Sequence, residues 1–251
     1  GAALPEALAL ESRVRKLPGV TRAAVAGSLR RRKETIGDID ILAEAKSSKS
    51  AMDAFVKFPN VARVLAQGDT KSSVKLSSGI QVDLRVVPAE SYGAALNYFT
   101  GSKEHNVALR ERAIKKGLKL NEYGLWKGSK YLAGKTEEEM YKALGLEYIE
   151  PEMREMTGEI EAAAGGKLPK LIGYGDLQGD LQVQTDWTDG STSIEGMALA
   201  AAERGLEYIV ITDHTKRLAM AHGLDEVRIL EQMAEIDRVQ KKIGSRIKIL
   251  K

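Results

Sequence analysis

The 251-residue sequence contains no cysteine, and this absence excludes disulfide bonds, thiolate catalysis and thiolate metal sites. Aromatic residues make up only 5% of the chain, so its cores must be built from Ala, Leu, Ile and Val. No apolar run reaches the roughly 18 residues that a membrane span needs. Only three histidines are present, which limits any imidazole-based metal centre. The remaining composition, with 43% apolar and 29% charged residues, is typical of a globular protein.

The net charge of +3 hides an uneven distribution along the chain. Residues 1–150 contain 25 Lys and Arg against 18 Asp and Glu, whereas residues 151–251 contain 13 against 17. An asymmetry of this kind predicts two units with different partners. The basic half is compatible with nucleic-acid binding, but on charge alone an ordinary charged surface is the preferred interpretation.

Hydrophobic periodicity predicts an alternation of helices and strands in the first half. The predicted helices are 3–16, 50–58, 89–98, 104–116 and 136–144, and the predicted strands are 20–25, 36–42, 61–67, 73–76 and 80–87. Three glycines divide the segment 124–134, which is therefore expected to be rich in turns.

The composition changes between residues 151 and 178, where glycine pairs and Pro151 predict a linker. Beyond it, the predicted order is strand, helix, strand, helix, strand, which favours a parallel α/β unit. These elements are expected at 181–185, 193–204, 208–212, 225–243 and 246–250. Since such a unit rarely ends on a third strand, we expect the second half to be the opening part of a longer domain.

Three aspartates are candidates for a metal site. Asp38 and Asp40 are two residues apart on a predicted strand, so both carboxylates project from the same face. Asp83 occupies a similar place in another predicted strand, and the three converge if the strands are neighbours. Carboxylate oxygens suit Mg²⁺ or Mn²⁺, and two such ions about 4 Å apart can activate a hydroxyl and stabilise a pyrophosphate leaving group. Taken alone, an Asp-x-Asp pair more often lies on a solvated edge.

A glycine-serine turn with arginines precedes these aspartates. Gly27 allows close backbone approach, Ser28 adds a hydroxyl donor, and Arg30 and Arg31 can form forked hydrogen bonds to phosphate. An exposed basic turn is the alternative interpretation. The combination of this turn with two strand carboxylates about ten residues later favours phosphate binding.

These residues belong to a longer series of motifs. In order, the series is Gly27-Ser28, Arg31, Gly37-Asp38-Ile39-Asp40, Asp83-Leu84-Arg85, Tyr98-Phe99-Thr100-Gly101-Ser102, Asn106, Arg110 and Asn121-Glu122-Tyr123. In order and spacing it resembles the palm and thumb of family X DNA polymerases, over about residues 20–128. The form Tyr-Phe-Thr-Gly-Ser-Lys-Glu-His-Asn is similar to that of the bacterial and archaeal members.

The resemblance implies roles for the matching residues. Asp38, Asp40 and Asp83 are implied to bind two Mg²⁺ or Mn²⁺ ions, with Asp83 activating the primer 3′-hydroxyl. The implied nucleotide contacts are Gly27, Ser28, Arg31, Gly37, Tyr98, Phe99, Gly101 and Asn106. Within this set, Ser28 and Arg31 match binders of the β- and γ-phosphates, and Asn106 matches the residue that contacts the incoming base from the minor-groove side.

Further roles concern DNA. Arg110 matches a template contact, Asn121 and Glu122 match thumb residues near the template, and Arg85 matches the residue that pairs with a catalytic carboxylate in the open enzyme. His105, between two of the motif residues, is interpreted as a structural polar residue.

The resemblance also implies an α+β fold with a defined domain order. Residues 1–19 correspond to the end of a fingers-like helical segment, 20–90 to a nucleotidyltransferase-type palm with a mixed β-sheet and helices on one side, and 91–150 to a small thumb. The linker 151–178 and a partial α/β PHP domain at 179–251 follow. Family members usually carry a lyase-type domain and DNA-gripping helix-hairpin-helix motifs ahead of the palm. The chain therefore looks truncated, with weaker DNA affinity and no lyase activity expected.

The second half resembles the start of the PHP (polymerase and histidinol phosphatase) domain of bacterial members, through the segments 179–190, 211–215 and 221–225. Gln182 and Gln184 occupy the positions of its usual His-x-His metal ligands. Asp213, His214 and His222 match other ligands. The expectation is an inert, incomplete metal site, and the alternative is weak residual metal binding.

The function predicted from the sequence is template-directed DNA polymerisation that fills short gaps in repair. The implied partners are gapped or primed DNA and a dNTP, without a membrane, in a cytoplasmic and nucleoid-associated enzyme. The alternatives are nucleotide transfer to a non-DNA acceptor, a weak fragment that only binds dNTP or DNA, and exonuclease activity from the PHP portion.

Overall fold

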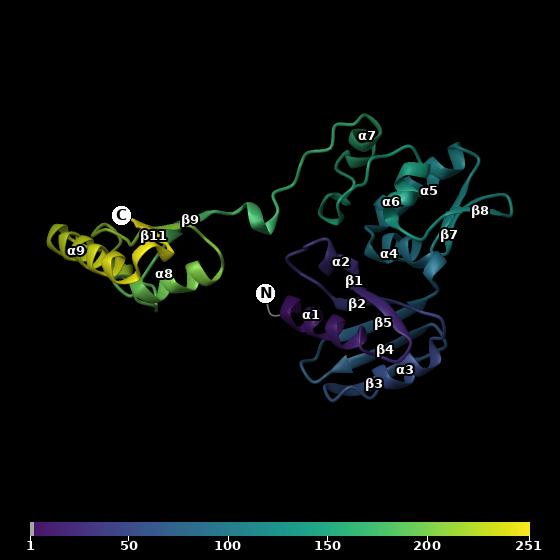
Figure 1. Cartoon of the computed structure of the whole chain (residues 1–251), viewed down its shortest axis with the longest axis horizontal. Helices are drawn as coiled ribbons and strands as arrows, with labels where there is room; N and C mark the ends of the chain where they lie inside the picture. Colours follow the sequence, from purple (N-terminus) through teal and green to yellow (C-terminus); the bar gives the residue numbers. More distant parts are fainter. Residues whose placement is uncertain (1–2) are drawn as a thin grey trace. The chain divides into compact units, whose positions relative to one another are not determined.

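The computed structural model describes residues 3–251, which divide into two units between Pro169 and Lys170 (Figure 1). The boundary differs from the predicted linker at 151–178. Residues 151–169 pack within the first unit, where the side chain of Arg154 is completely buried. None of the helices between residues 3 and 251 has both the length and the apolar composition that a membrane crossing requires.

A five-stranded mixed sheet forms the first half of the first unit, in the order β1-β2-β5-β4-β3. Its strands are β1 (Val20–Val25), β2 (Asp38–Ala45), β3 (Val61–Gln67), β4 (Lys71–Leu76) and β5 (Gln81–Val87). Neighbouring strands are antiparallel except β2 and β5, which are parallel. The predicted mixed sheet is thus confirmed.

The two faces of this sheet differ in character. Ile39, Ile41 and Ala43 of β2 are buried in a core with the helices α1 (Ala3–Val14) and α3 (Lys49–Phe55). Because side chains alternate along a strand, the aspartates of β2 lie on the opposite face. A helix also reaches that opposite face, since Leu42 packs with Tyr92 and its neighbours, so the expectation of helices on one side holds only for α1 and α3.

The second half of the first unit has its own core, built from buried residues between 94 and 163. Its elements are η1 (Ala89–Ser91), α4 (Tyr92–Thr100), α5 (Lys103–Lys115), β6 (Lys119–Asn121), β7 (Gly124–Lys127), β8 (Lys130–Ala133), α6 (Glu137–Ala143), η2 (Pro151–Met153) and α7 (Glu159–Ala164). The segment expected to be turn-rich is an antiparallel three-stranded sheet, β6-β7-β8. Its strands of three or four residues are too short to show a clear alternation.

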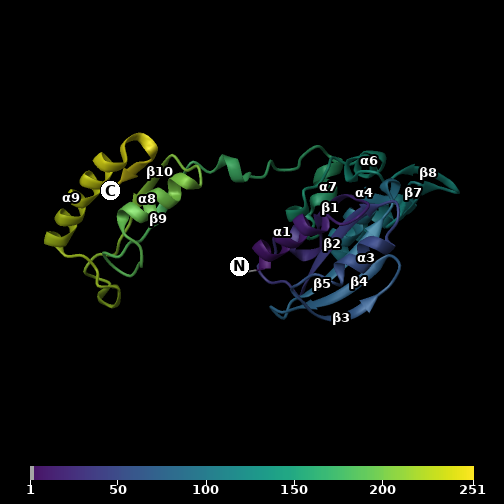
Figure 2. The same ribbon diagram turned by 60° about the horizontal axis from the view of Figure 1, so that its bottom comes forward.

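The second unit is a small parallel α/β layer. Its elements are η3 (Tyr174–Asp176), β9 (Gly179–Val183), α8 (Ile194–Glu203), β10 (Tyr208–Ile211), η4 (Ala219–Ala221), α9 (Glu226–Ile243), η5 (Gly244–Arg246) and β11 (Lys248–Leu250). Strand β10 is central and pairs with both β9 and β11. Both pairings are parallel, as the sequence predicts. Helices α8 and α9 run beside this sheet (Figure 2) and share one apolar core with it.

Candidate active site

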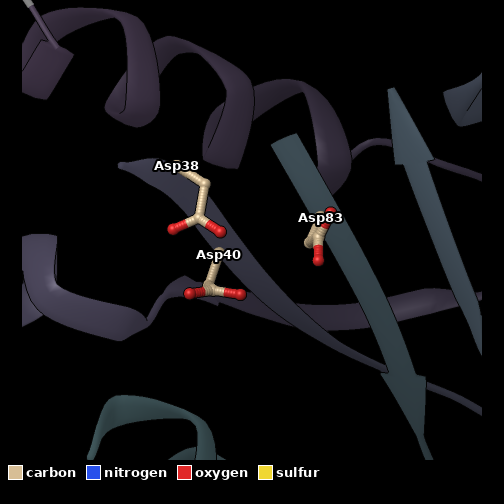
Figure 3. Close-up of side chains that lie close together, drawn as sticks. All are labelled: Asp38, Asp40 and Asp83. Atoms are coloured by element: carbon tan, nitrogen blue, oxygen red, sulfur yellow. The ribbon is translucent and has the colours of Figure 1, made fainter. Parts of the chain in front are cut away.

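The three aspartates predicted from the sequence come together on the polar face of the first sheet. Strands β2 and β5 are direct neighbours, and their register places Asp40 opposite Asp83. One carboxylate oxygen from each of Asp38, Asp40 and Asp83 lies within 4.8 Å of the others (Figure 3). The sequence predicted that the three carboxylates would converge if their strands were neighbours. The strands are neighbours, and the carboxylates do converge.

The protonation of Asp40 reflects this crowding. Burial and, to a smaller extent, the negative charges of Asp38 and Asp83 together raise the pKa of Asp40 to about 6. The positive charges of Arg85 and Lys71 act in the opposite direction but are outweighed. Three carboxylates in so small a space carry excess negative charge, which a divalent cation would offset.

Asp83 has a different environment because cations and donors surround it. Lys71 Nζ lies 2.5 Å from Asp83 Oδ2, and Gln81 donates from Nε2 to Asp83 Oδ1 over 3.0 Å. Burial acts to raise the pKa of Asp83, but hydrogen bonds from Lys71, Ser73 and Gln81 outweigh it and hold the pKa below its ordinary value. Lys71 was not identified from the sequence. It reaches the site because β4 pairs with β5, with Ser73 opposite Asp83.

The glycine-serine turn lies directly against the aspartates. Helix α2 (Gly27–Arg30) begins where β1 ends, and the Ala26 backbone N–H donates to the Asp40 carbonyl oxygen over 2.8 Å. Gly27 has φ +64°, and a Cβ atom added there would lie 2.4 Å from Asp40 Oδ2. Only glycine leaves space for the carboxylate at this point.

The two arginines of the turn contact the second half of the unit. Arg31 donates from Nε to Glu155 Oε1 over 2.8 Å and from Nη1 to the Thr100 carbonyl over 2.5 Å. Arg30 forms a forked pair with Glu137, with distances of 3.0 Å and 2.7 Å. Arg30, considered for phosphate binding from the sequence, is thus a structural link here. A phosphate would have to displace Glu155 from Arg31.

Glu137 is a buried acid that belongs to none of the sequence motifs described above. Besides Arg30, it accepts from Arg154 Nη1 over 2.6 Å and from the Tyr148 hydroxyl over 3.1 Å. Burial acts to raise the pKa of Glu137, but Arg154 and Arg30 outweigh it and hold the pKa at about 2. The only signal available was its place in the first turn of a predicted helix.

Several of the predicted nucleotide and DNA residues lie on α4 and on the strand that precedes it. Tyr98 and Phe99 end α4, and their rings meet edge to face with centroids 5.0 Å apart. The guanidinium of Arg85 lies over the Phe99 ring, 4.1 Å from its centroid, instead of pairing closely with an aspartate. Its Nε atom is buried and has no hydrogen-bond partner among the described residues.

The remaining predicted residues have distinct settings. Asn106 is buried in the first turns of α5, whereas Arg110 is exposed further along the same helix. Asn121 accepts hydrogen bonds from the backbone N–H groups of Tyr123 and Gly124, so its side chain shapes the β6–β7 turn. Its predicted template contact would have to coexist with that role.

The metal-ligand candidates of the second unit do not form a comparable group in the part of the chain that the structure describes. Asp213 is occupied by hydrogen bonds from Thr185, Thr188 and Gln232, which together fill both carboxylate oxygens. His214 instead lies 3.4 Å from Asp189. A carboxylate with four acceptor positions in use does not fit a metal cluster.

Comparisons with known proteins agree with this geometry. Residues 95–155 match the family model "DNA polymerase beta thumb". The chain is 36% identical over 241 residues to "DNA polymerase/3′-5′ exonuclease PolX" of Bacillus subtilis, which covers 94% of this chain and 42% of that protein. It is 30% identical over 159 residues to DNA polymerase lambda of Rattus norvegicus, covering 51% of this chain and 28% of that protein.

The fold is also similar to a solved structure. A crystal structure of Leishmania infantum polymerase beta in a ternary P/T complex shares it with a TM-score of 0.54 and 24% identity, over 61% of this chain and 75% of that one. The chain spans less than half the length of the Bacillus relative. In sequence the chain is similar to these DNA polymerases, and in fold it is similar to the solved polymerase beta.

Proposed function

We propose that this chain carries the catalytic part of a template-directed DNA polymerase, which transfers a nucleotide from a dNTP to a primer 3′-hydroxyl. The observation that carries the proposal is the convergence of Asp38, Asp40 and Asp83 directly beside the Gly27 turn. Carboxylates for cations and a tight backbone turn for phosphates are the two components that nucleotidyl transfer needs. The names of the relatives, DNA polymerases PolX and lambda, support the same reaction.

The three aspartates fit a pair of divalent cations. Their donors are all oxygens, and burial together with the charges of Asp38 and Asp83 raises the pKa of Asp40. When bound, Mg²⁺ or Mn²⁺ would lower the pKa of the primer hydroxyl and stabilise the pyrophosphate leaving group. Asp83, ionised because its pKa is lowered, would orient that hydroxyl and receive its proton.

The remaining assignments extend this proposal to the substrates. Residues 20–90 would act as palm and 91–150 as thumb. We assign nucleotide contacts to Gly27, Ser28, Arg31, Gly37, Tyr98, Phe99, Gly101 and Asn106, and DNA contacts to Arg85, Arg110, Asn121 and Glu122. Short gaps in DNA repair are the proposed substrates.

Primer extension on a one-nucleotide gap, with each dNTP supplied singly, tests chemistry and template dependence together. Asp83→Asn keeps the shape of the side chain and removes its charge, and it is expected to lower extension by about 100-fold or more. Asp69→Asn changes an exposed aspartate of the β3–β4 turn and is the matched control. Extension by Asp83→Asn at the control rate would contradict the assigned mechanism.

The same assay separates the alternatives. Incorporation that ignores the template base would favour a nucleotidyltransferase without template dependence. Binding of dNTP without extension would favour a fragment that does not turn over. Release of 3′ nucleotides that survives Asp83→Asn would indicate a nuclease site elsewhere, which the hydrogen-bonded Asp213 does not support.

A further inference from the structure

A chain of buried polar side chains runs through the second half of the first unit and ends at Asn106. It starts at Glu159 in α7 and continues through His105 of α5, Tyr141 of α6 and Asn97 of α4. All five are buried, with exposed fractions between 0% for His105 and 8% for Asn106. Four helices thus contribute to one hydrogen-bonded series. Such a series is expected, because polar groups buried away from water need hydrogen-bond partners within the protein.

The His105 ring is held from both sides. Its Nδ1 lies 2.7 Å from Glu159 Oε1, and its Nε2 lies 2.8 Å from the Tyr141 hydroxyl. Burial acts to raise the pKa of Glu159, but hydrogen bonds from His105 and from backbone amides hold it below its ordinary value. An ionised carboxylate only accepts hydrogen bonds, so Nδ1 carries a hydrogen and the orientation of the ring is fixed.

The series continues from Tyr141 to Asn106. The Tyr141 hydroxyl lies 3.0 Å from Asn97 Oδ1, and Asn97 Nδ2 donates to Asn106 Oδ1 over 3.4 Å. At the end of the series, Asn106 Nδ2 donates to the Tyr98 carbonyl oxygen over 2.7 Å. The Tyr141 hydroxyl donates its single hydrogen to Asn97 Oδ1, so the contact with His105 Nε2 is a hydrogen bond when that nitrogen carries a hydrogen.

These bonds give the Asn106 amide a defined orientation. Its Oδ1 atom is directed to Asn97, and one of the two Nδ2 hydrogens is directed to Tyr98. The second Nδ2 hydrogen remains for another acceptor. Without the Asn97 contact, only the bond to the Tyr98 carbonyl would oppose the orientation in which Oδ1 and Nδ2 exchange places, and in that orientation an acceptor on a ligand would meet an oxygen.

We propose that His105, Tyr141 and Asn97 are positioning residues that hold the Asn106 amide with its free N–H toward the incoming base. This inference rests on the proposed function, in which Asn106 contacts the base from the minor-groove side. The residues do not touch the nucleotide. They act by preventing the Asn106 amide, which contacts the nucleotide, from taking the orientation with Oδ1 and Nδ2 exchanged.

The test pairs a protein hydroxyl with one atom of the nucleotide. Tyr141→Phe removes only the bridging hydroxyl, and Tyr131→Phe removes one that donates to the Glu90 carbonyl outside the series. Each protein is supplied with dATP or with 3-deaza-dATP, which lacks the minor-groove nitrogen acceptor, opposite dT in a one-nucleotide gap. The ratio of the two kcat/KM values measures the contact at that atom.

The wild type and Tyr131→Phe are expected to prefer dATP by about fivefold or more, the value of one hydrogen bond. In Tyr141→Phe this preference should fall to about twofold or less, through a raised KM for dATP with kcat little changed. Equal losses with both nucleotides would show a merely structural role and overturn the inference. If Tyr141→Phe does not fold, Asn97→Asp, which keeps Oδ1 and removes the donor to Asn106, is expected to give the same loss of preference.

A second measurement does not depend on activity. The side-chain amide resonance of Asn106, assigned with Asn106→Asp, is expected to shift in Tyr141→Phe and in Glu159→Gln but not in Tyr131→Phe. An unchanged resonance in Tyr141→Phe overturns the inference. If the wild type incorporates neither nucleotide, the proposed function fails, while this spectrum still decides whether the series orients Asn106.

Discussion

At the scale of single residues, the geometry of the site depends on Gly27, which has no side chain. Gly27 lies against Asp40 with a positive φ, and an added Cβ would overlap the carboxylate. The residue therefore sets the position of a proposed metal ligand by leaving space for it. Asp40 in turn fixes the turn through its carbonyl oxygen, which accepts from Ala26.

Gly27→Ala is expected to lower primer extension and Mn²⁺ affinity by roughly 10- to 100-fold, because a displaced carboxylate loses the geometry that binding and catalysis need. The control is Gly19→Ala, since Gly19 also has a positive φ (+75°) but nothing lies within 4 Å of its added Cβ. Both variants should lose about 1 kcal/mol of stability from the backbone conformation. Mn²⁺ titration followed by electron paramagnetic resonance should then separate them, and equal affinities would contradict the assignment.

How far the site could be predicted also depends on the residue. Asp38 and Asp40 share a face by the alternation of one strand, and this was readable from the sequence. That Asp83 faces Asp40 depends on the register of β2 and β5, which no local pattern encodes. Lys71 and Glu137 reach their partners through long-range pairing, so a lysine in a strand and a glutamate in a helix gave no signal.

At the scale of elements, most helices and strands of the first unit lie within two or three residues of their predicted bounds. The errors arose where local patterns are weak. The strands of the β6-β7-β8 sheet are short and separated by glycines. The segment 151–169 has the composition of a linker, yet it packs in the first unit because Arg154 is held by Glu137 and the Ile149 carbonyl.

Glu137 joins α6 to α2 through Arg30, so it should stabilise the fold in a pH-dependent manner. Its folded pKa of about 2 is below its ordinary value of 4.5, so the stabilisation is complete above pH 4.5 and is lost as the pH falls toward 2. Glu137→Gln is expected to lower the free energy of unfolding by about 3 kcal/mol at pH 7.

Urea unfolding monitored by Trp126 fluorescence, in a Trp187→Phe background, measures this effect. The difference between the parent protein and Glu137→Gln should shrink between pH 4.5 and pH 2. A difference that stays constant over this range would mean that the charge of Glu137 does not contribute.

At the scale of the whole molecule, the assigned residues all lie in the first of two units. The second unit is a separate α/β layer whose Asp213 ties the loop after β9 to α9 through Thr185 and Gln232. The carboxylate that the family resemblance implies as a metal ligand therefore accepts hydrogen bonds from two segments of its own unit.

Asp213→Asn is expected to lower the unfolding midpoint of the second unit, because an amide cannot accept all of these hydrogen bonds. Trp187 fluorescence during heating reports on that unit. Primer extension at 25 °C should remain at the wild-type rate, since no residue assigned to the reaction lies beyond residue 169. A parallel loss of extension would show that the second unit contributes to the reaction.

The parallel pairing of β2 with β5 has a consequence for when the three aspartates come together during folding. The two strands are joined by a long connection that contains α3, β3 and β4, so their contact closes a large loop at an entropic cost. Non-local strand pairs of this kind form slowly compared with helices and hairpins. Asp83 therefore meets Asp38 and Asp40 only when the central strands have joined, and a nascent chain lacks the proposed metal site until the sheet of its first unit is nearly complete.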